Sequence, residues 1–114
     1  MTVWNDVPGL NNELYRFRRR HFLESLAGRK GVFVLMKITA FTHPSVLYVK
    51  ASNDLAEVEG KCLENTKLYR EAKRRGCNAV AVFMTGRLPA SKVGEIADSI
   101  RAANDPPLNE AIAQ

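Results

Sequence analysis

The stretch GVFVLMKIT, residues 31–39, decides the fold class, because a run of β-branched, aromatic and aliphatic residues of this length is typical of a buried β-strand. Two other segments have the same character: SVLYVK at residues 45–50 and NAVAVFM at residues 78–84. The linker between the first two ends in Pro44, a strand breaker, so these two strands are expected to pair antiparallel. The sequence therefore predicts a small three-stranded sheet, mixed or antiparallel.

An N-terminal helix is predicted over residues 11–27. Leu14, Phe17 and His21 recur at three- and four-residue steps, which is the helical period. Gly28 suits the position after the helix, because glycine adopts a positive φ without a Cβ clash. The other face of this helix carries a run of arginines, so a structural role and a basic surface can coexist on it.

Three more helices are predicted to flank the strands. The first follows the capping residues Ser52 and Asn53, the second begins at Thr66, and the third runs from Ser91 to near Asn104. The expected fold class is α/β (α+β), a sheet flanked by helices with an extra helix at the N-terminal side. The residues expected to be largely buried are Phe33, Leu35, Leu47, Val49, Val80, Val82, Ile96 and Ile100.

The size and composition predict one domain. The chain has 114 residues, of which 46% are hydrophobic, enough for a core without disulfides or metal. We expect a domain over residues 11–109, an N-terminal tail over 1–10 and a C-terminal tail over 110–114. The most apolar windows are far shorter than the roughly 20 residues of a membrane-spanning helix, and no secretory signal is evident. A cytoplasmic protein without membrane contact is the expectation.

The charge distribution favours an anionic partner. Seventeen Lys and Arg against twelve Asp and Glu give a net charge of +5, and the basic residues fall in blocks. The alternative is that these blocks are ordinary solvated helix faces. If they bind nucleic acid, the candidate contacts are Arg70, Lys73, Arg74, Arg75, Lys67, Lys50, Arg18 and Arg19.

The chain carries no pattern for a cofactor or a metal. Cys62 and Cys77 are in neither a CxxC nor a His-paired spacing, so both are expected to be reduced packing residues. His21 and His43 are isolated, without a second ligand at metal-binding spacing. No P-loop, GxGxxG, GxSxG or HExxH occurs in the sequence. No cofactor and no metal site are predicted.

Several short motifs together resemble the GIY-YIG nucleases. Gly31-Val32-Phe33 stands where that family has Gly-Ile-Tyr, and Tyr48-Val49-Lys50 stands where it has Tyr-Ile-Gly. Ser52, Asn53 and Leu55 are similar to the segment that leads into the family's next helix, and residues 105–109 (DPPLN) resemble its closing turn. The resemblance spans roughly residues 31–109, and it implies the order of strands and helices given above.

The resemblance also implies a site that has lost most of its chemistry. The family uses tyrosines to position water, an arginine after YIG to stabilise phosphate charge, and a glutamate on the last helix to hold a divalent metal. Here the first tyrosine position is Phe33, the arginine position is Val58, and Glu95 or Asp98 could supply the carboxylate only with a shifted register. Tyr48 alone is retained, so these positions are vestigial. For Phe33, Tyr48 and Val58 the favoured interpretation is ordinary packing, as core or half-buried residues of a sheet with a helix across it.

Three functions are consistent with these patterns. The leading hypothesis is a catalytically degenerate GIY-YIG-like domain that binds nucleic acid, with DNA as the expected target, through a basic surface without cutting it. The second is a protein-interaction module, an inhibitor or adaptor that reuses the fold to bind an acidic protein surface. The third is a divalent-metal-dependent endonuclease with a rearranged site. The oligomeric state does not follow from the sequence.

Overall fold

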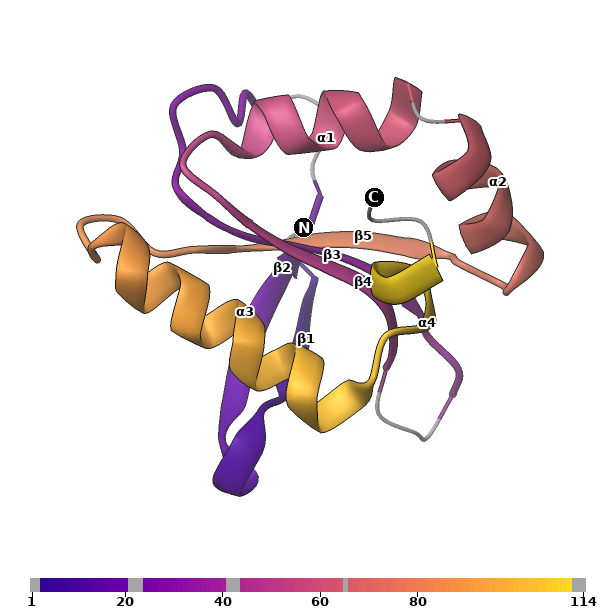
Figure 1. Ribbon diagram of the computed structural model, residues 1–114, viewed down its shortest axis with the longest axis horizontal. Coiled ribbons are helices and arrows are strands. Elements are labelled where there is room, and N and C mark those ends of the chain that lie inside the picture. Colours follow the sequence, from indigo (N-terminus) through magenta and orange to yellow (C-terminus); the bar gives the residue numbers. More distant parts are fainter. Residues whose placement is uncertain (1–2, 21–23, 41–43, 65, 112–114) are drawn as a thin grey trace.

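The computed structural model describes residues 3–20, 24–40, 44–64 and 66–111, which form a five-stranded antiparallel sheet with helices on both faces (Figure 1). The strands are β1 (Trp4–Pro8), β2 (Leu14–Arg19), β3 (Gly31–Lys37), β4 (Ser45–Ser52) and β5 (Ala79–Met84), in the order β1-β2-β5-β3-β4. The helices are η1 (Leu10–Asn12, a 3-10 turn), α1 (Leu55–Glu64), α2 (Thr66–Arg74), α3 (Ala90–Asn104) and α4 (Pro107–Ala111). Within the described residues, no helix combines the length and apolar character needed to cross a membrane.

The α+β class and the three predicted strands are confirmed as β3, β4 and β5. β3 lies between β5 and β4 and pairs antiparallel with both, which explains why residues 31–36 are all buried. Gly31 sits where β3 meets β5 so closely that an added Cβ would lie 2.2 Å from the backbone oxygen of Phe83. β3 is therefore the centre of the fold.

The N-terminal helix expected over residues 11–27 is wrong, and so is the tail expected over 1–10. Trp4–Pro8 and Leu14–Arg19 instead form the hairpin β1–β2, and β2 continues the sheet by pairing with β5. Asn11 and Asn12 have φ values of 57° and 64°, and two consecutive positive φ angles reverse a chain tightly between two strands. The sheet therefore has five strands instead of three. Residues 21–23, the predicted end of that helix with His21, lie outside the described residues.

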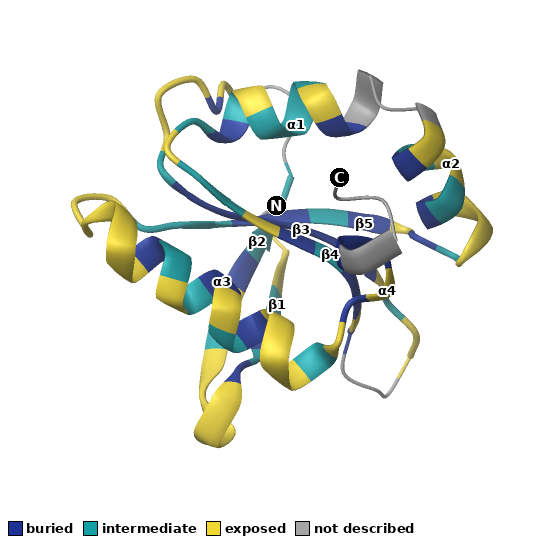
Figure 2. Cartoon of the chain, in the orientation of Figure 1, coloured by how far each residue is buried: buried dark blue, intermediate teal, exposed yellow. Residues whose placement is uncertain are grey.

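Each face of the sheet has its own hydrophobic core (Figure 2). On one face α3 packs Val93, Ala97 and Ile100 against β3 and β4. On the other face α1, α2 and α4 bury the side chains of Leu55, Cys62, Leu68, Ala72 and Leu108 against the sheet. Of the predicted core residues, Phe33, Leu35, Leu47, Val49, Val82 and Ile100 are buried, whereas Val80 and Ile96 are half-buried.

A β-bulge in β4 turns Tyr48 toward α1. Leu35 pairs with Tyr48 and Met36 pairs with Val46, so Leu47 is the extra residue on β4. As a result Leu47 and Tyr48 both belong to the core on the α1 and α2 side, although neighbouring strand residues normally alternate. The bulge thus decides which face of the sheet presents the Tyr48 hydroxyl.

Candidate nucleic-acid interface

The exposed side of α2 is strongly basic. Leu68 and Ala72, four residues apart, are buried against the sheet, which turns the opposite side of the helix to solvent. Gly76, with φ of 90°, lets the chain leave the helix and enter β5. We call the exposed side, together with the residue that follows the helix, the α2 basic face; it consists of Lys67, Arg70, Lys73, Arg74 and Arg75, all of them exposed.

The α2 basic face holds one compensating carboxylate. Between Thr66 and Arg75 the sequence has five basic residues and one acidic residue, Glu71, a local balance of +4. Arg74 Nη2 lies 2.8 Å from Glu71 Oε2, and Arg75 Nε lies 3.8 Å from the same oxygen. The hydrogen bond from Arg74 lowers the pKa of Glu71 and raises the pKa of Arg74. Among the described residues, Arg70 has no ion pair, so its guanidinium is available to an external anion.

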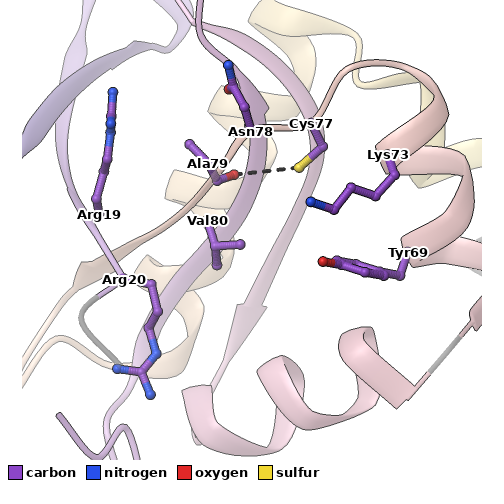
Figure 3. A pocket seen from close by; sticks show the side chains of 8 residues that line it. All are labelled: Arg19, Arg20, Tyr69, Lys73, Cys77, Asn78, Ala79 and Val80. Atoms are coloured by element: carbon purple, nitrogen blue, oxygen red, sulfur yellow. Dashed lines mark hydrogen bonds between the residues drawn. The ribbon is translucent and has the colours of Figure 1, made fainter. Parts of the chain in front are cut away.

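A cleft joins this face to the sheet. It has a volume of about 270 Å³ and lies between α2 and the adjoining ends of β2 and β5 (Figure 3). We call it the α2–β5 cleft; its lining residues are Arg19, Arg20, Tyr69, Lys73, Cys77, Asn78, Ala79 and Val80. Tyr69 and Lys73 extend side by side from α2 into the cleft, with Lys73 Nζ 5.4 Å from the ring centroid. Cations beside an aromatic ring suit a phosphate and the base attached to it.

Arg20 is fixed in the wall of the α2–β5 cleft by several bonds. Its backbone N–H donates to the carbonyl oxygen of Val80 at 2.7 Å, which extends the β2–β5 pairing by one residue. Its Nε donates to Glu59 Oε2 at 2.5 Å, and its Nη1 donates to the carbonyl oxygen of Glu24 at 2.7 Å. Both side chains of the Arg20 and Glu59 pair are largely buried. Arg20 was not among the predicted contacts, although the arginine run at residues 16–20 pointed to this segment.

Two of the predicted basic contacts lie elsewhere. The guanidinium of Arg18 is paired with the carboxylate of Glu24, and its Nη1 donates to Glu24 Oε2 at 2.8 Å, so Arg18 has an internal partner and a raised pKa. Lys50 lies on β4, across the sheet from β2. Arg19 lines the α2–β5 cleft, and its Nε donates to Asn5 Oδ1 at 3.0 Å. The fold therefore brings Lys73 of α2 together with Arg19 in one cleft, and it places Lys50 elsewhere.

A second cleft holds the positions suggested by the family resemblance. Tyr48, Lys50, Val58 and Lys61 line a cavity of about 290 Å³ between β4 and α1. Burial raises the pKa of Tyr48, which makes its hydroxyl harder to deprotonate. Lys61 is paired with Glu57 at 2.8 Å. Phe33 is fully buried and is not among the residues that line this cavity.

The carboxylates of α3 lie away from Tyr48. Glu95 lines a third cleft with Tyr15 and Ser99, on the α3 face of the sheet, whereas Tyr48 faces α1. Asp98 is exposed on α3. Among the described residues, no three His, Cys, Asp or Glu side chains gather where they could hold one metal ion.

Comparison of the chain with known proteins gave no match. No protein-family model fits it, and no curated protein or solved structure is significantly similar to it. A fold alone does not define a function, so the function has to be inferred from the side chains of the site.

Proposed function

We propose that this protein binds nucleic acid through the α2 basic face and the α2–β5 cleft, and that it does not cut what it binds. The observation that carries the proposal is the meeting of two basic segments that are about 50 residues apart in the chain. Lys73 of α2 and Arg19 and Arg20 at the end of β2 line one cleft. The other residues of the α2 basic face continue this positive charge over the exposed side of the helix, where the local charge balance is +4.

Contacts to phosphate supply most of the affinity in this proposal. Arginine and lysine on an exposed face neutralise phosphates and release counterions, which gives binding that depends strongly on salt and little on sequence. Tyr69 adds an aromatic ring at the mouth of the cleft, where an unpaired base could stack. The surface ion pair of Arg74 with Glu71 costs little to open, since exposed pairs contribute about 0–1 kcal/mol.

We further propose that the domain is a degenerate relative of the GIY-YIG nucleases. The elements β3, β4, α1, α2, β5 and α3 follow one another as the resemblance implies. Asn109, in the closing turn of the resemblance, holds the edge of β4 through its side chain. The absence of cutting is supported by Val58 beside Tyr48, where an arginine would stabilise phosphate charge, and by Glu95 on the other face of the sheet.

Fluorescence anisotropy with labelled duplex DNA, single-stranded DNA and RNA, measured over a salt series, tests the proposal. The key variant is Arg70→Ala with Lys73→Ala, since Arg70 has no ion pair among the described residues and Lys73 lines the cleft. Loss of two phosphate contacts is expected to reduce the slope of log K against log salt by about 1.8 on duplex. Affinity at about 0.1 M salt should fall roughly ten- to sixtyfold, equally for all sequences.

The matched control removes two positive charges from the α3 side of the sheet. Arg87→Ala with Lys92→Ala lowers the net charge by the same amount, but both residues are remote from α2, so affinity should change less than about threefold. Equal losses in the two double variants would leave only a general charge effect and refute the α2 site. No salt-dependent binding by the wild type would refute nucleic-acid binding and favour an acidic protein partner. Cleavage with Mg²⁺ or Mn²⁺ that Tyr48→Phe abolishes would instead establish a nuclease.

A further inference from the structure

The hairpin β1–β2 exposes apolar side chains that a single copy of the protein leaves in water. Among the described residues, the large hydrophobic side chains that are at least 40% exposed are Val3, Trp4, Leu10, Leu14 and Leu88. Four of these five belong to the hairpin or to the residue before it, and the fifth, Leu88, lines one cleft together with Leu10. Trp4 is 46% exposed and Leu14 is 56% exposed. Of these residues, Trp4 lies on the edge strand β1 itself, where a strand added to the sheet would contact it.

The backbone of β1 presents an unpaired edge from Trp4 to Asp6, whereas farther along the strand Asn104 Nδ2 donates to the Pro8 oxygen at 2.7 Å. Arg19 N–H donates to the Val3 oxygen at 2.9 Å, and Gly9 N–H donates to the Glu13 oxygen at 2.8 Å. In an antiparallel ladder these bonds alternate, so the odd-numbered residues of β1 point their backbone groups at β2. The N–H and C=O of Trp4 and Asp6 therefore point outward, and no group within the described part of the chain bonds to them. An open edge of this kind is a template for another strand.

The charges around this edge fit a second copy of the same chain. Although the whole protein carries +5, Asp6 lies opposite Arg16 on the hairpin, and Arg18 is paired with Glu24. The patch is therefore locally balanced and does not favour an anionic partner. A patch that holds both signs complements itself when it is rotated by a two-fold axis, which is the requirement of a symmetric dimer interface.

We propose that two copies of the chain pair their β1 strands antiparallel about a two-fold axis at Asn5, which makes one continuous sheet across both copies. Trp4 of each copy then forms a hydrogen-bonded pair with Asp6 of the other, so that every outward N–H from Trp4 to Asp6 finds an acceptor. Pro8, which has no N–H, falls outside the paired stretch. A register centred on Asp6 would place two carboxylates opposite each other and set Trp4 against Pro8, so it is disfavoured.

Disulfide trapping tests this register directly. Asn5 faces its own counterpart as a non-hydrogen-bonded pair, with a Cα separation of about 4.5 Å that a disulfide can span. Asn5→Cys should therefore form a covalent dimer under mild oxidation with glutathione disulfide. In the matched control, Asp6→Cys, the two sulfurs belong to a diagonal pair about 7–8 Å apart, so linking should be at least tenfold slower. The natural Cys62 and Cys77 are buried, so the wild type should stay unlinked.

Sedimentation equilibrium and tryptophan fluorescence follow the interface without a covalent link. Trp4 is the only tryptophan of the chain, so its emission should shift to shorter wavelength as the concentration rises from about 1 to 500 µM and the dimer forms. Trp4→Lys, which puts a charge on the edge, should be monomeric over that range while its circular dichroism is unchanged. A monomeric wild type throughout the range, or equal linking rates for the two cysteine variants, overturns the proposal. Nucleic-acid binding by the α2 basic face is a separate measurement and is unaffected by either result.

Discussion

The side-chain amide of Asn109 makes two hydrogen bonds to the backbone of Val49, accepting from its N–H at 2.8 Å and donating to its carbonyl oxygen at 2.7 Å. β4 is an edge strand, and these two bonds occupy backbone groups that would otherwise face outward. The amide therefore acts as one additional residue of the sheet, contributed from α4. This edge is closed by the chain itself, in contrast to the open edge of β1.

Replacing Asn109 should unpair the edge of β4. Asn109 is 8% exposed, so in Asn109→Ala both backbone groups of Val49 lose their partner in a site that water reaches poorly. We expect a loss of about 2–4 kcal/mol in the free energy of unfolding, measured by urea denaturation. Asn109→Asp should lose a similar amount, because a carboxylate cannot donate to the Val49 oxygen. Asn53→Ala, an exposed asparagine, serves as the control and should change stability by less than about 0.5 kcal/mol.

The ion pair of Arg20 and Glu59 should contribute more than the surface pairs do. Its side chains are 10% and 17% exposed, so Glu59→Gln removes the negative charge that faces the largely buried guanidinium of Arg20. The expected loss is about 2–4 kcal/mol in urea denaturation. In the Lys61 and Glu57 pair the side chains are mostly exposed, so Glu57→Gln is the comparison and should cost less than about 0.5 kcal/mol. Equal losses would show that burial does not distinguish the two pairs.

Glycine substitutions in β3 and α3 should have opposite signs. In Gly31→Ala the new methyl group meets the backbone oxygen of Phe83, which cannot move without breaking the pairing of β3 with β5. We expect a loss of at least about 3 kcal/mol, or failure to fold. Gly94 lies within α3 with nothing within 4 Å of an added Cβ, so Gly94→Ala should stabilise the protein by about 0.5–1 kcal/mol. Thermal unfolding followed by circular dichroism measures both.

Stability should fall at alkaline pH because of Cys62. Burial raises the pKa of its thiol from 9.0 to about 11, with smaller contributions from Cys77 and Glu59. Above pH 9 the unfolded chain releases this proton while the folded protein retains it, so the stabilisation is complete below pH 9 and is lost as the pH rises toward 11. The free energy of unfolding should drop by roughly 1–3 kcal/mol over that range. Cys62→Ala should show a flatter dependence, whatever its stability at pH 7.

The central part of the fold could be predicted because its signals are local. The runs that form β3 and β5 are apolar throughout, and α2 and α3 are bounded by Gly76 and Asn104 near the expected positions. A helix was predicted in place of the hairpin because Leu14 and Phe17 are three residues apart, a spacing that also fits the helical period. Tyr15 and Phe17 alternate onto the core as strand residues do, and Pro8-Gly9 with the consecutive Asn11 and Asn12 gave a turn signal between the two strands.

The site was less predictable than the fold, since it depends on which strands pair. The basic residues of α2 are evident from the sequence, but the place of Arg19 and Arg20 beside Lys73 follows from the pairing of β2 with β5. No local pattern specifies that pairing. The sequence also could not predict that Glu95 and Tyr48 lie on opposite faces of the sheet. The bulge at Leu47 decides which face Tyr48 occupies, and no local pattern indicates that bulge.

The pairing of β2 with β5 also sets an order of events during synthesis. Residue 18 lies opposite residue 82, so the hairpin leaves the ribosome long before the strand that anchors it. Until β5 and α3 emerge, Val7 and Phe17, both fully buried in the finished protein, have no complete core to enter. Pairing β2 with β5 closes a long loop, and the entropy lost in closing it comes before the stabilising contacts form. This pairing is therefore a slow step of folding. The nascent hairpin is thus the segment that chaperones would meet, and the emergence of α3 after β5 ends that exposure.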